Sequence, residues 1–354
     1  MDTGEVATAP RPGARSLTAR IVSRTWKTAL ALAVVSGGWW TAAHGVAGVA
    51  WGDVVSVLRG VAPWQLGLLA GIWLGGLCIY ATVLSAAMPG LGLRRSLLLN
   101  LSGSAVANVF PLGGAVATAL NWRMVRKWGH SNGAFVSYCV LTNALDVLTK
   151  LVLPLVGVAA LVVLSVHVPT VLWAVAGSCA VLLLVGLAVL QVQTSRVRPD
   201  RGAESHESAD QRWHSALRRH LRDSGGRIRS LLALRWPRLL PASAGYIAAQ
   251  VALLFFSLRA VGLVAPVTVV LMAAAIERLG SLIPLTPGGT GVAEVGTIAW
   301  LVASGLDPVE AVAGVLLYRV FLVAMEVPLG GLLLGGWAWL QRASASNPSG
   351  EVAV

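Results

Sequence analysis

The 354-residue chain is 56% hydrophobic and only 12% charged, with a mean hydropathy of +0.74. A soluble domain carries roughly a quarter charged residues, so this composition excludes a water-soluble globular protein and predicts an all-α polytopic membrane protein. The formal net charge of +12 does not indicate nucleic-acid binding, because 11 of the 27 basic residues lie in one segment (196–238) and five lie in the first 27 residues. Basic clusters beside apolar stretches are typical of cytoplasmic membrane loops.

In chain order, we expect a disordered, basic, cytoplasmic N-terminus over residues 1–27 and then about six full spans, each long enough to cross the hydrocarbon core. The Arg-rich segment 194–239 is expected to be a cytoplasmic loop, and 343–354 a disordered tail. The protein would then be a multi-pass protein of the cell membrane. The predicted spans are 28–50, 64–88, 134–166, 170–192, 240–262 and 310–340.

Two further apolar stretches, 96–122 and 272–303, are interrupted by proline and glycine. The first contains Pro111-Leu-Gly-Gly and the second Pro284-Leu-Thr-Pro-Gly-Gly-Thr-Gly. Proline removes a helix donor and glycine is a poor helix former, so each half is too short to cross alone. Each stretch therefore predicts a broken re-entrant hairpin, which must be buried in protein or line a watery cavity. A hairpin at 96–122 also keeps the basic clusters on its two sides in the cytoplasm.

The two halves of the chain overlay after a shift of 176 residues, the interval from Pro111 to Pro287. The charge bias places the second copy upside down, which predicts an inverted repeat of the kind found in transporters. Membrane repeat 1 would cover 28–193, and repeat 2 would cover 240–342 with 170–192 as its first span. The alternative is that two Pro-Gly breaks fell at similar spacing by chance.

Ionisable residues inside the predicted spans are candidate functional residues, because charge in the membrane is costly. Asp146 and Lys150 lie four positions apart on one helix face and can pair. A substrate role and a structural ion pair both account for them. The candidate gating or ion-pair residues are Asp146, Lys150, Glu277, Arg278 and Glu326.

The glycine-rich break of the second hairpin precedes a half-helix whose free N–H groups and positive dipole end can receive a phosphate. A plain hinge is the alternative, and no Walker lysine follows, which disfavours nucleotide binding. The candidate substrate-binding residues are Pro287, Gly288, Gly289, Thr290, Gly291, Glu294, Tyr318 and Arg319. The candidate residues of the first hairpin are Asn108, Pro111, Gly113, Gly114 and Arg123.

Nothing in the sequence indicates catalysis or a bound cofactor. There is no Ser-His-Asp order, no pair of catalytic carboxylates and no His/Cys cluster with metal-ligand spacing. Three cysteines lie in apolar segments, where we interpret them as small hydrophobic residues. We therefore expect no metal, no cofactor and no enzymatic activity.

The string from Ile283 to Glu294, followed by Gly305 and by Leu-Tyr-Arg ending at Arg319, resembles the C-terminal signature of the lysylphosphatidylglycerol synthase transmembrane-region family. Its members are also called flippase-like or UPF0104 proteins. The segment from Asn108 to Gly129 resembles the first-half motif of that family, and the resemblance covers about residues 28–342. In many relatives an acidic residue and an arginine closely follow the first Pro-Gly turn. Here Gly-Ala-Val stands there, and the arginine comes later.

The resemblance implies a membrane domain that moves lipids between leaflets, with an anionic or aminoacylated phospholipid as substrate. In bifunctional relatives a large soluble C-terminal domain makes the aminoacylated lipid. Since the sequence ends shortly after the last span, we expect no aminoacyl-transfer domain and no lysyltransferase activity. One alternative is a non-transporting scaffold or accessory subunit for a lipid-modifying enzyme or glycosyltransferase. An intramembrane lipid-modifying enzyme is a further alternative, although no catalytic constellation supports it.

Overall fold

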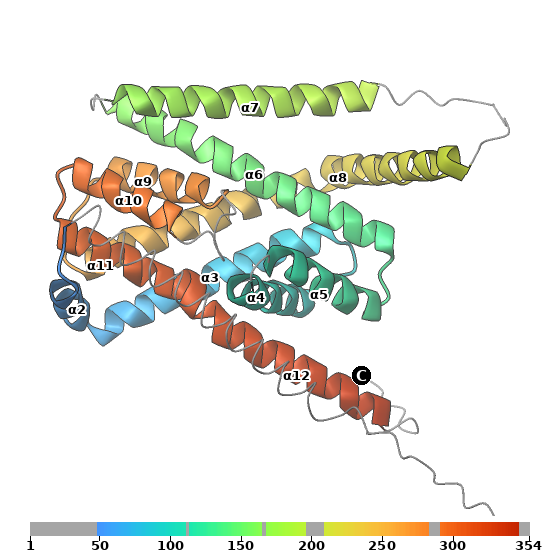
Figure 1. Ribbon diagram of the computed structural model, residues 1–354, viewed down its shortest axis with the longest axis horizontal. Coiled ribbons are helices and arrows are strands. Elements are labelled where there is room, and N and C mark those ends of the chain that lie inside the picture. The colour runs from blue at the N-terminus through green and yellow to red at the C-terminus, as the bar shows by residue number, and fades with distance from the viewer. Residues whose placement is uncertain (1–47, 111–112, 165–167, 196–208, 283–290, 347–354) are drawn as a thin grey trace, which may run out of the picture.

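The computed structural model describes residues 48–110, 113–164, 168–195, 209–282 and 291–346, and all regular elements in these ranges are helices. Figure 1 shows them in one view. In chain order they are α2 (Trp51–Arg59), α3 (Pro63–Ala87), α4 (Leu93–Val109), α5 (Gly113–Lys127), α6 (Asn132–Val163), α7 (Thr170–Ser195), α8 (Ala209–Ala260), α9 (Val267–Gly280), α10 (Val292–Ala303), α11 (Pro308–Arg319), a π-helix η3 (Val320–Ala324) and α12 (Glu326–Ser346).

Four of the described helical stretches are long and apolar enough to cross a membrane: α3, α6, the part of α8 from Leu234 to Ala260, and α11–α12 up to Arg342. They confirm the predicted spans 64–88, 134–166, 240–262 and 310–340 to within a few residues at most ends. Helix α7 forms over the predicted span 170–192, although the apolar part described there is a shorter helix, Thr170–Gly186. The predicted span 28–50 and the N-terminus 1–27 lie almost entirely outside the described residues.

The segment 194–239, predicted to connect two spans on the cytoplasmic side, is helical over most of its length. Helix α8 runs unbroken from Ala209 to Ala260, so the second half of the Arg-rich segment is helical. Arginine, leucine and alanine dominate this part and are strong helix formers, and a high charge does not oppose a helix. The predicted tail 343–354 is likewise helical as far as Ser346.

Helix α2, of nine residues, was not predicted, because it is too short for a search based on span length. It follows the described residues 48–50 and packs against α11. Asp53 lies in its first turn and Arg59 in its last, and both charges are favourable there because they oppose the helix dipole. Arg59 thus has a local structural role at the end of α2.

At each Pro-Gly break, two short helices pack side by side: α4 against α5, and α9 against α10 (Figure 1). Small residues permit the close approach. A Cβ on Gly103 would lie 2.9 Å from Asn121 of α5, and a Cβ on Gly280 would lie 2.6 Å from Ala293 of α10. Small residues at helix contacts are typical of membrane bundles. A break between two packed helical arms is therefore confirmed in both stretches, although Gly113 already belongs to α5.

The connection between α5 and α6 (128–131) recurs 176 residues later between α10 and α11 (304–307). Gly129 and Gly305 hold the same position in these turns, with φ of +87° and +82°, a left-handed conformation that glycine adopts without strain. The last residue of each turn then caps the next helix through its side chain. Ser131 accepts a hydrogen bond from the third residue of α6, and Asp307 accepts one from the third residue of α11.

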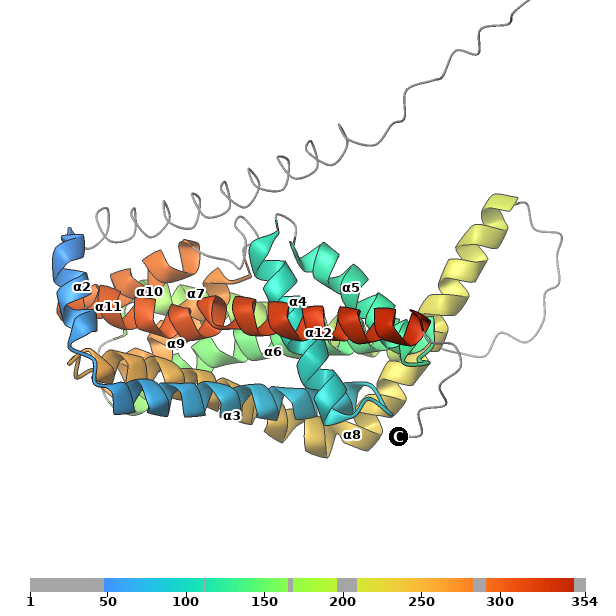
Figure 2. The same ribbon diagram turned by 90° about the horizontal axis from the view of Figure 1, so that it is seen from below.

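The two halves are interleaved in space. Helix α3 packs against its counterpart α8, α4 packs against α12, and α9 packs against α6. In each half, the first hairpin arm therefore lies against the last long helix of the other half, as the crossing of α4 and α12 in Figure 2 illustrates. Reciprocal packing of this kind is what a two-fold relation between the halves produces.

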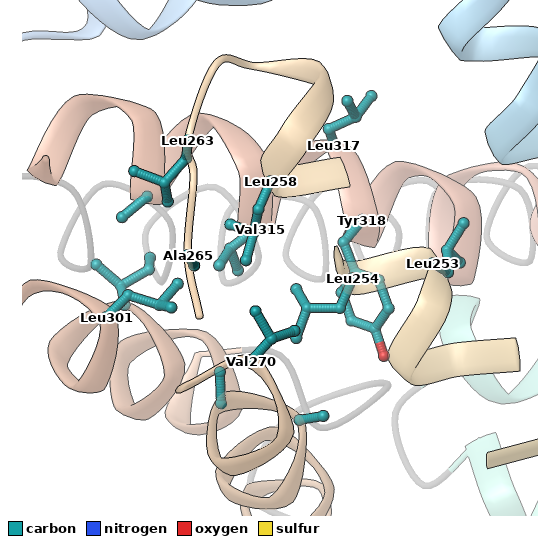
Figure 3. Packing of buried hydrophobic residues seen from close by; sticks show 14 of the residues in the cluster. Leu253, Leu254, Leu258, Leu263, Ala265, Val270, Leu301, Val315, Leu317 and Tyr318 are labelled. Atoms are coloured by element: carbon teal, nitrogen blue, oxygen red, sulfur yellow. The ribbon is translucent and has the colours of Figure 1, made fainter. Parts of the chain in front are cut away.

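The principal hydrophobic core lies where α8, α9, α10 and α11 converge (Figure 3). Leu254, Leu258, Val270, Leu301 and Val315 are each at most 1% exposed. Burying a side chain of this size contributes about 1.5–3 kcal/mol, so these four helices form a stable platform. Arg319, the last residue of α11, lies at the edge of this platform, beside the two helices of the second hairpin.

Candidate functional site

The guanidinium of Arg319, at the end of α11, reaches both arms of the second hairpin. Its Nη2 lies 3.1 Å from Oε1 of Glu277 on α9, and its Nε lies 2.9 Å from Oε1 of Glu294 on α10. The side chains of Arg319, Glu277 and Glu294 are only 7%, 5% and 1% exposed. We call these three residues the arginine triad, which carries one net negative charge when ionised.

Glu294 has a second role at the start of α10. Its Oε2 accepts a hydrogen bond of 2.6 Å from the backbone N–H of Gly291, which precedes the helix and has a φ of +108°. A carboxylate at this position is favoured by the positive end of the helix dipole. The N–H of Gly291, which the sequence suggested for phosphate, is thus occupied by Glu294. The other candidates of that turn, 287–290, lie outside the described residues.

A second group of charges joins α6 to α9. Nζ of Lys150 lies 2.7 Å from Oδ2 of Asp146, which confirms the pair predicted from their spacing, and Nη1 of Arg278 lies 4.0 Å from Oδ1 of the same aspartate. The side chain of Asp146 is 39% exposed, whereas those of Lys150 and Arg278 are 11% and 12% exposed. We call these three residues the aspartate cluster, which carries one net positive charge when ionised.

Two tyrosines that the sequence analysis did not single out complete the aspartate cluster. The guanidinium of Arg278 lies 5.7 Å from the centroid of the Tyr246 ring on α8, within the range of a cation–π interaction. Tyr246 in turn stacks on Tyr80 of α3 at 4.5 Å. Asp146, Arg278 and both tyrosines line one small cavity. A tyrosine in an apolar stretch gives no sequence signal that separates this role from core packing.

The arginine triad and the aspartate cluster meet on α9. Glu277 and Arg278 are consecutive there, and successive helical residues point in different directions. Glu277 therefore faces α11 while Arg278 faces α6 and α8. Tyr318, the other candidate on α11, is 2% exposed and is directed into the core beside Leu254 (Figure 3).

Glu326 lies just beyond a π-helix that separates α11 from α12. The irregular turn is marked by a hydrogen bond of 2.8 Å from Met325 N–H to the carbonyl oxygen of Val320, five residues back. Glu326 is 8% exposed, and it lines a small cavity with Trp73 and Gln250. No lysine or arginine in the described ranges lies within ion-pair distance of its carboxyl. Single-turn π-helices are frequent at functional sites.

The first hairpin has no comparable charge cluster among its described residues. Asn108 is half-buried near the end of α4, Gly114 and Arg123 are exposed, and Pro111 lies outside the described residues. Gly113 has a steric role, because a Cβ there would lie 2.2 Å from the carbonyl oxygen of Ala107. Among the described residues, the ion pairs that involve a hairpin therefore involve the second and not the first, in keeping with the departure of the first-half motif from the family pattern.

Comparison with known proteins identifies the family. Residues 27–330 match the model for the lysylphosphatidylglycerol synthase TM region, whereas no curated protein sequence matches the chain. The matched region covers more than four fifths of the chain and includes the arginine triad and the aspartate cluster. Together with the long apolar helices, this shows a multi-pass membrane protein that belongs to the lysylphosphatidylglycerol synthase transmembrane-region family.

Proposed function

We propose that this protein moves a phospholipid between the leaflets of the membrane without hydrolysing ATP. The observation that carries the proposal is the arginine triad, in which one buried arginine joins both arms of a broken hairpin. Ionisable groups within a membrane bundle are costly to maintain and typically mark a substrate or ion pathway. Membership of a family named for lysylphosphatidylglycerol synthase supports a lipid as the substrate.

The relation between the two halves also supports transport. Recurring turns and caps, with reciprocal packing of α4 on α12 and α9 on α6, are what two inverted repeats would produce. In this proposal each hairpin enters the membrane and returns to the same side, the first from the cytoplasm and the second from outside. Transporters with inverted repeats place broken helices near the middle of the bilayer, where the substrate site lies.

The charges suggest how a headgroup would enter. The aspartate cluster carries one net positive charge and can receive the phosphate of a headgroup, while the adjacent arginine triad links its own charges across three helices. Without substrate, ion pairs within each group compensate two of its three charges. A headgroup would exchange these internal pairs for its own, and the acyl chains would stay in lipid.

The test is movement of fluorescent phospholipids in vesicles that contain the purified protein, followed with a membrane-impermeant quencher. The variants Glu294→Gln and Arg319→Ala should slow the movement at least tenfold, because each removes one charge of the arginine triad. Arg259→Ala is the matched control, since Arg259 is exposed at the end of α8 and contacts the Phe255 ring rather than a carboxylate. Each variant must elute as a monodisperse species before reconstitution. A scaffold without transport activity predicts equal rates with and without protein for every lipid class.

A further inference from the structure

A large apolar groove lies beside the aspartate cluster, and the inference from it rests on the proposed function. The groove has a volume of about 720 Å³ and runs between α6, α8 and α9. This volume is within the range of ~300–1,000 Å³ typical of small-molecule sites. Its walls are almost wholly hydrophobic and include Val152 and Val156 of α6, Val251 and Phe255 of α8, and Val270 of α9.

One end of the groove is polar. Leu145, Thr149, Ser243 and Ile247 line both the groove and the small cavity that contains Asp146, so the two spaces adjoin. The small cavity has a volume of only about 20 Å³, room for about one water, so a ligand in the groove would bring its charged group to these four residues and into the place of the Asp146 carboxylate. A phospholipid has this structure, because it joins apolar acyl chains to a charged headgroup.

The charges at the polar end favour an anion. Lys150 and Arg278 supply two positive charges against the single carboxylate of Asp146. The separation of 4.0 Å between Arg278 and Asp146 is long for an ion pair, and Nε of Arg278 has no hydrogen-bond partner in the described part of the chain. A guanidinium with an unused N–H fits a phosphate, which accepts paired hydrogen bonds from arginine. Asp146, the most exposed member, is the group that a phosphate would displace.

We propose that the groove binds one acyl chain of an anionic phospholipid whose phosphate is held by Arg278 and Lys150. The shape of α8 supports a defined site rather than loose contact with bulk lipid. Ala244, Ala248 and Ala252 recur every four residues, so they share one helix face, and all three line the groove. These small side chains provide the width that an acyl chain needs, and a large side chain at Ala248 would block the groove.

The site is tested with the full chain in detergent and phosphatidylglycerol that carries a photoreactive group on one acyl chain. Phosphatidylcholine with the same chain is the comparison. We expect crosslinks to concentrate on the groove residues of α6, α8 and α9, with at least fivefold more labelling by phosphatidylglycerol. Ala248→Trp should reduce this labelling at least tenfold. Ala174→Trp, on an exposed position of α7 outside the groove, should leave it unchanged.

The headgroup contact is tested separately. Arg278→Gln should remove the preference for phosphatidylglycerol, and Arg278→Lys should restore part of it, which shows that loss of charge and not of folding is responsible. Crosslinks spread evenly over lipid-facing helices, or no preference between the two lipids in the wild-type protein, would overturn the proposal. Because binding is measured without transport, labelling of the groove combined with no lipid movement in vesicles would refute the proposed function and leave the binding site standing.

Discussion

At the scale of single residues, the chain compensates buried charges in two different ways. Asp146 and Lys150 pair within one helix, so their contact could be predicted from a spacing of four residues. Arg319 instead pairs with residues on two other helices, α9 and α10. These contacts depend on how three helices pack, which no local pattern encodes. The sequence could therefore indicate which charged residues are candidates for a functional site, but not which of them form ion pairs between helices.

The arginine triad makes a specific stability prediction. Arg319→Ala leaves Glu277 and Glu294 buried side by side without their cation, and breaking a buried ion pair costs about 3–5 kcal/mol. We expect the thermal midpoint in detergent to fall by many degrees. Arg259→Ala, at an exposed position, should change the unfolding free energy by less than about 1 kcal/mol. Equal midpoints for the two variants would show that the triad does not hold the helices together.

For Glu326 we expect the opposite effect, a substitution that stabilises the protein. It is 8% exposed and pairs with none of the described lysines or arginines, so burial of its charge is not compensated by an ion pair. The nearly isosteric Glu326→Gln removes that cost and should stabilise the protein by roughly 1 kcal/mol or more. The check is the thermal midpoint at neutral pH. A lower midpoint would contradict this prediction and would show that hydrogen bonds from neighbours such as Ser104 or Trp73 stabilise the charged carboxylate.

At the scale of elements, the length of the apolar runs and the positions of helix-breaking residues predict most of the helices and breaks. Long apolar runs predicted α3, α6 and the last spans, and proline with glycine predicted the breaks before α5 and α10. The extension of α8 could not be predicted from charge, because a run of arginines is compatible with both a loop and a helix. The π-helix at 320–324 contains no proline or glycine that would indicate an irregular turn from the sequence.

The contact between the hairpin arms can be tested at one glycine. A Cβ on Gly280 would lie 2.6 Å from the Cα of Ala293, so Gly280→Ala should force α9 and α10 apart and destabilise the protein by about 1–3 kcal/mol. Gly177→Ala in α7 is the matched control, because no atom lies within 4 Å of its added Cβ. Alanine is the better helix former, so the control should be neutral or more stable. Similar thermal midpoints for both variants would show that the arms do not pack this closely.

At the scale of the whole molecule, the two halves repeat with an offset of 176 residues, including the capping residues Ser131 and Asp307. The chain order of elements could be predicted from that offset. The packing of each first hairpin arm against the last long helix of the other half could not be predicted, because it is a property of the packed bundle. The inverted relation makes a direct topological prediction, since the two caps should lie on opposite sides of the membrane.

In a cysteine-free background, Ser131→Cys should react with an impermeant maleimide only after the cells are opened. Asp307→Cys should react in intact cells. The two positions are structural counterparts, so each is the matched control for the other. Labelling of both from the same side would show parallel rather than inverted halves.

Lipid movement in vesicles of anionic phospholipid tests the central claim most directly. The protein is expected to accelerate exchange between leaflets well above the rate in protein-free vesicles, and Glu294→Gln is expected to remove most of that acceleration. The side chain of Glu294 is 1% exposed and contacts both Arg319 and the start of α10, so this substitution changes the proposed site and little of the lipid-facing surface. Equal rates for wild-type protein, the variant and empty vesicles would contradict a role in lipid transport.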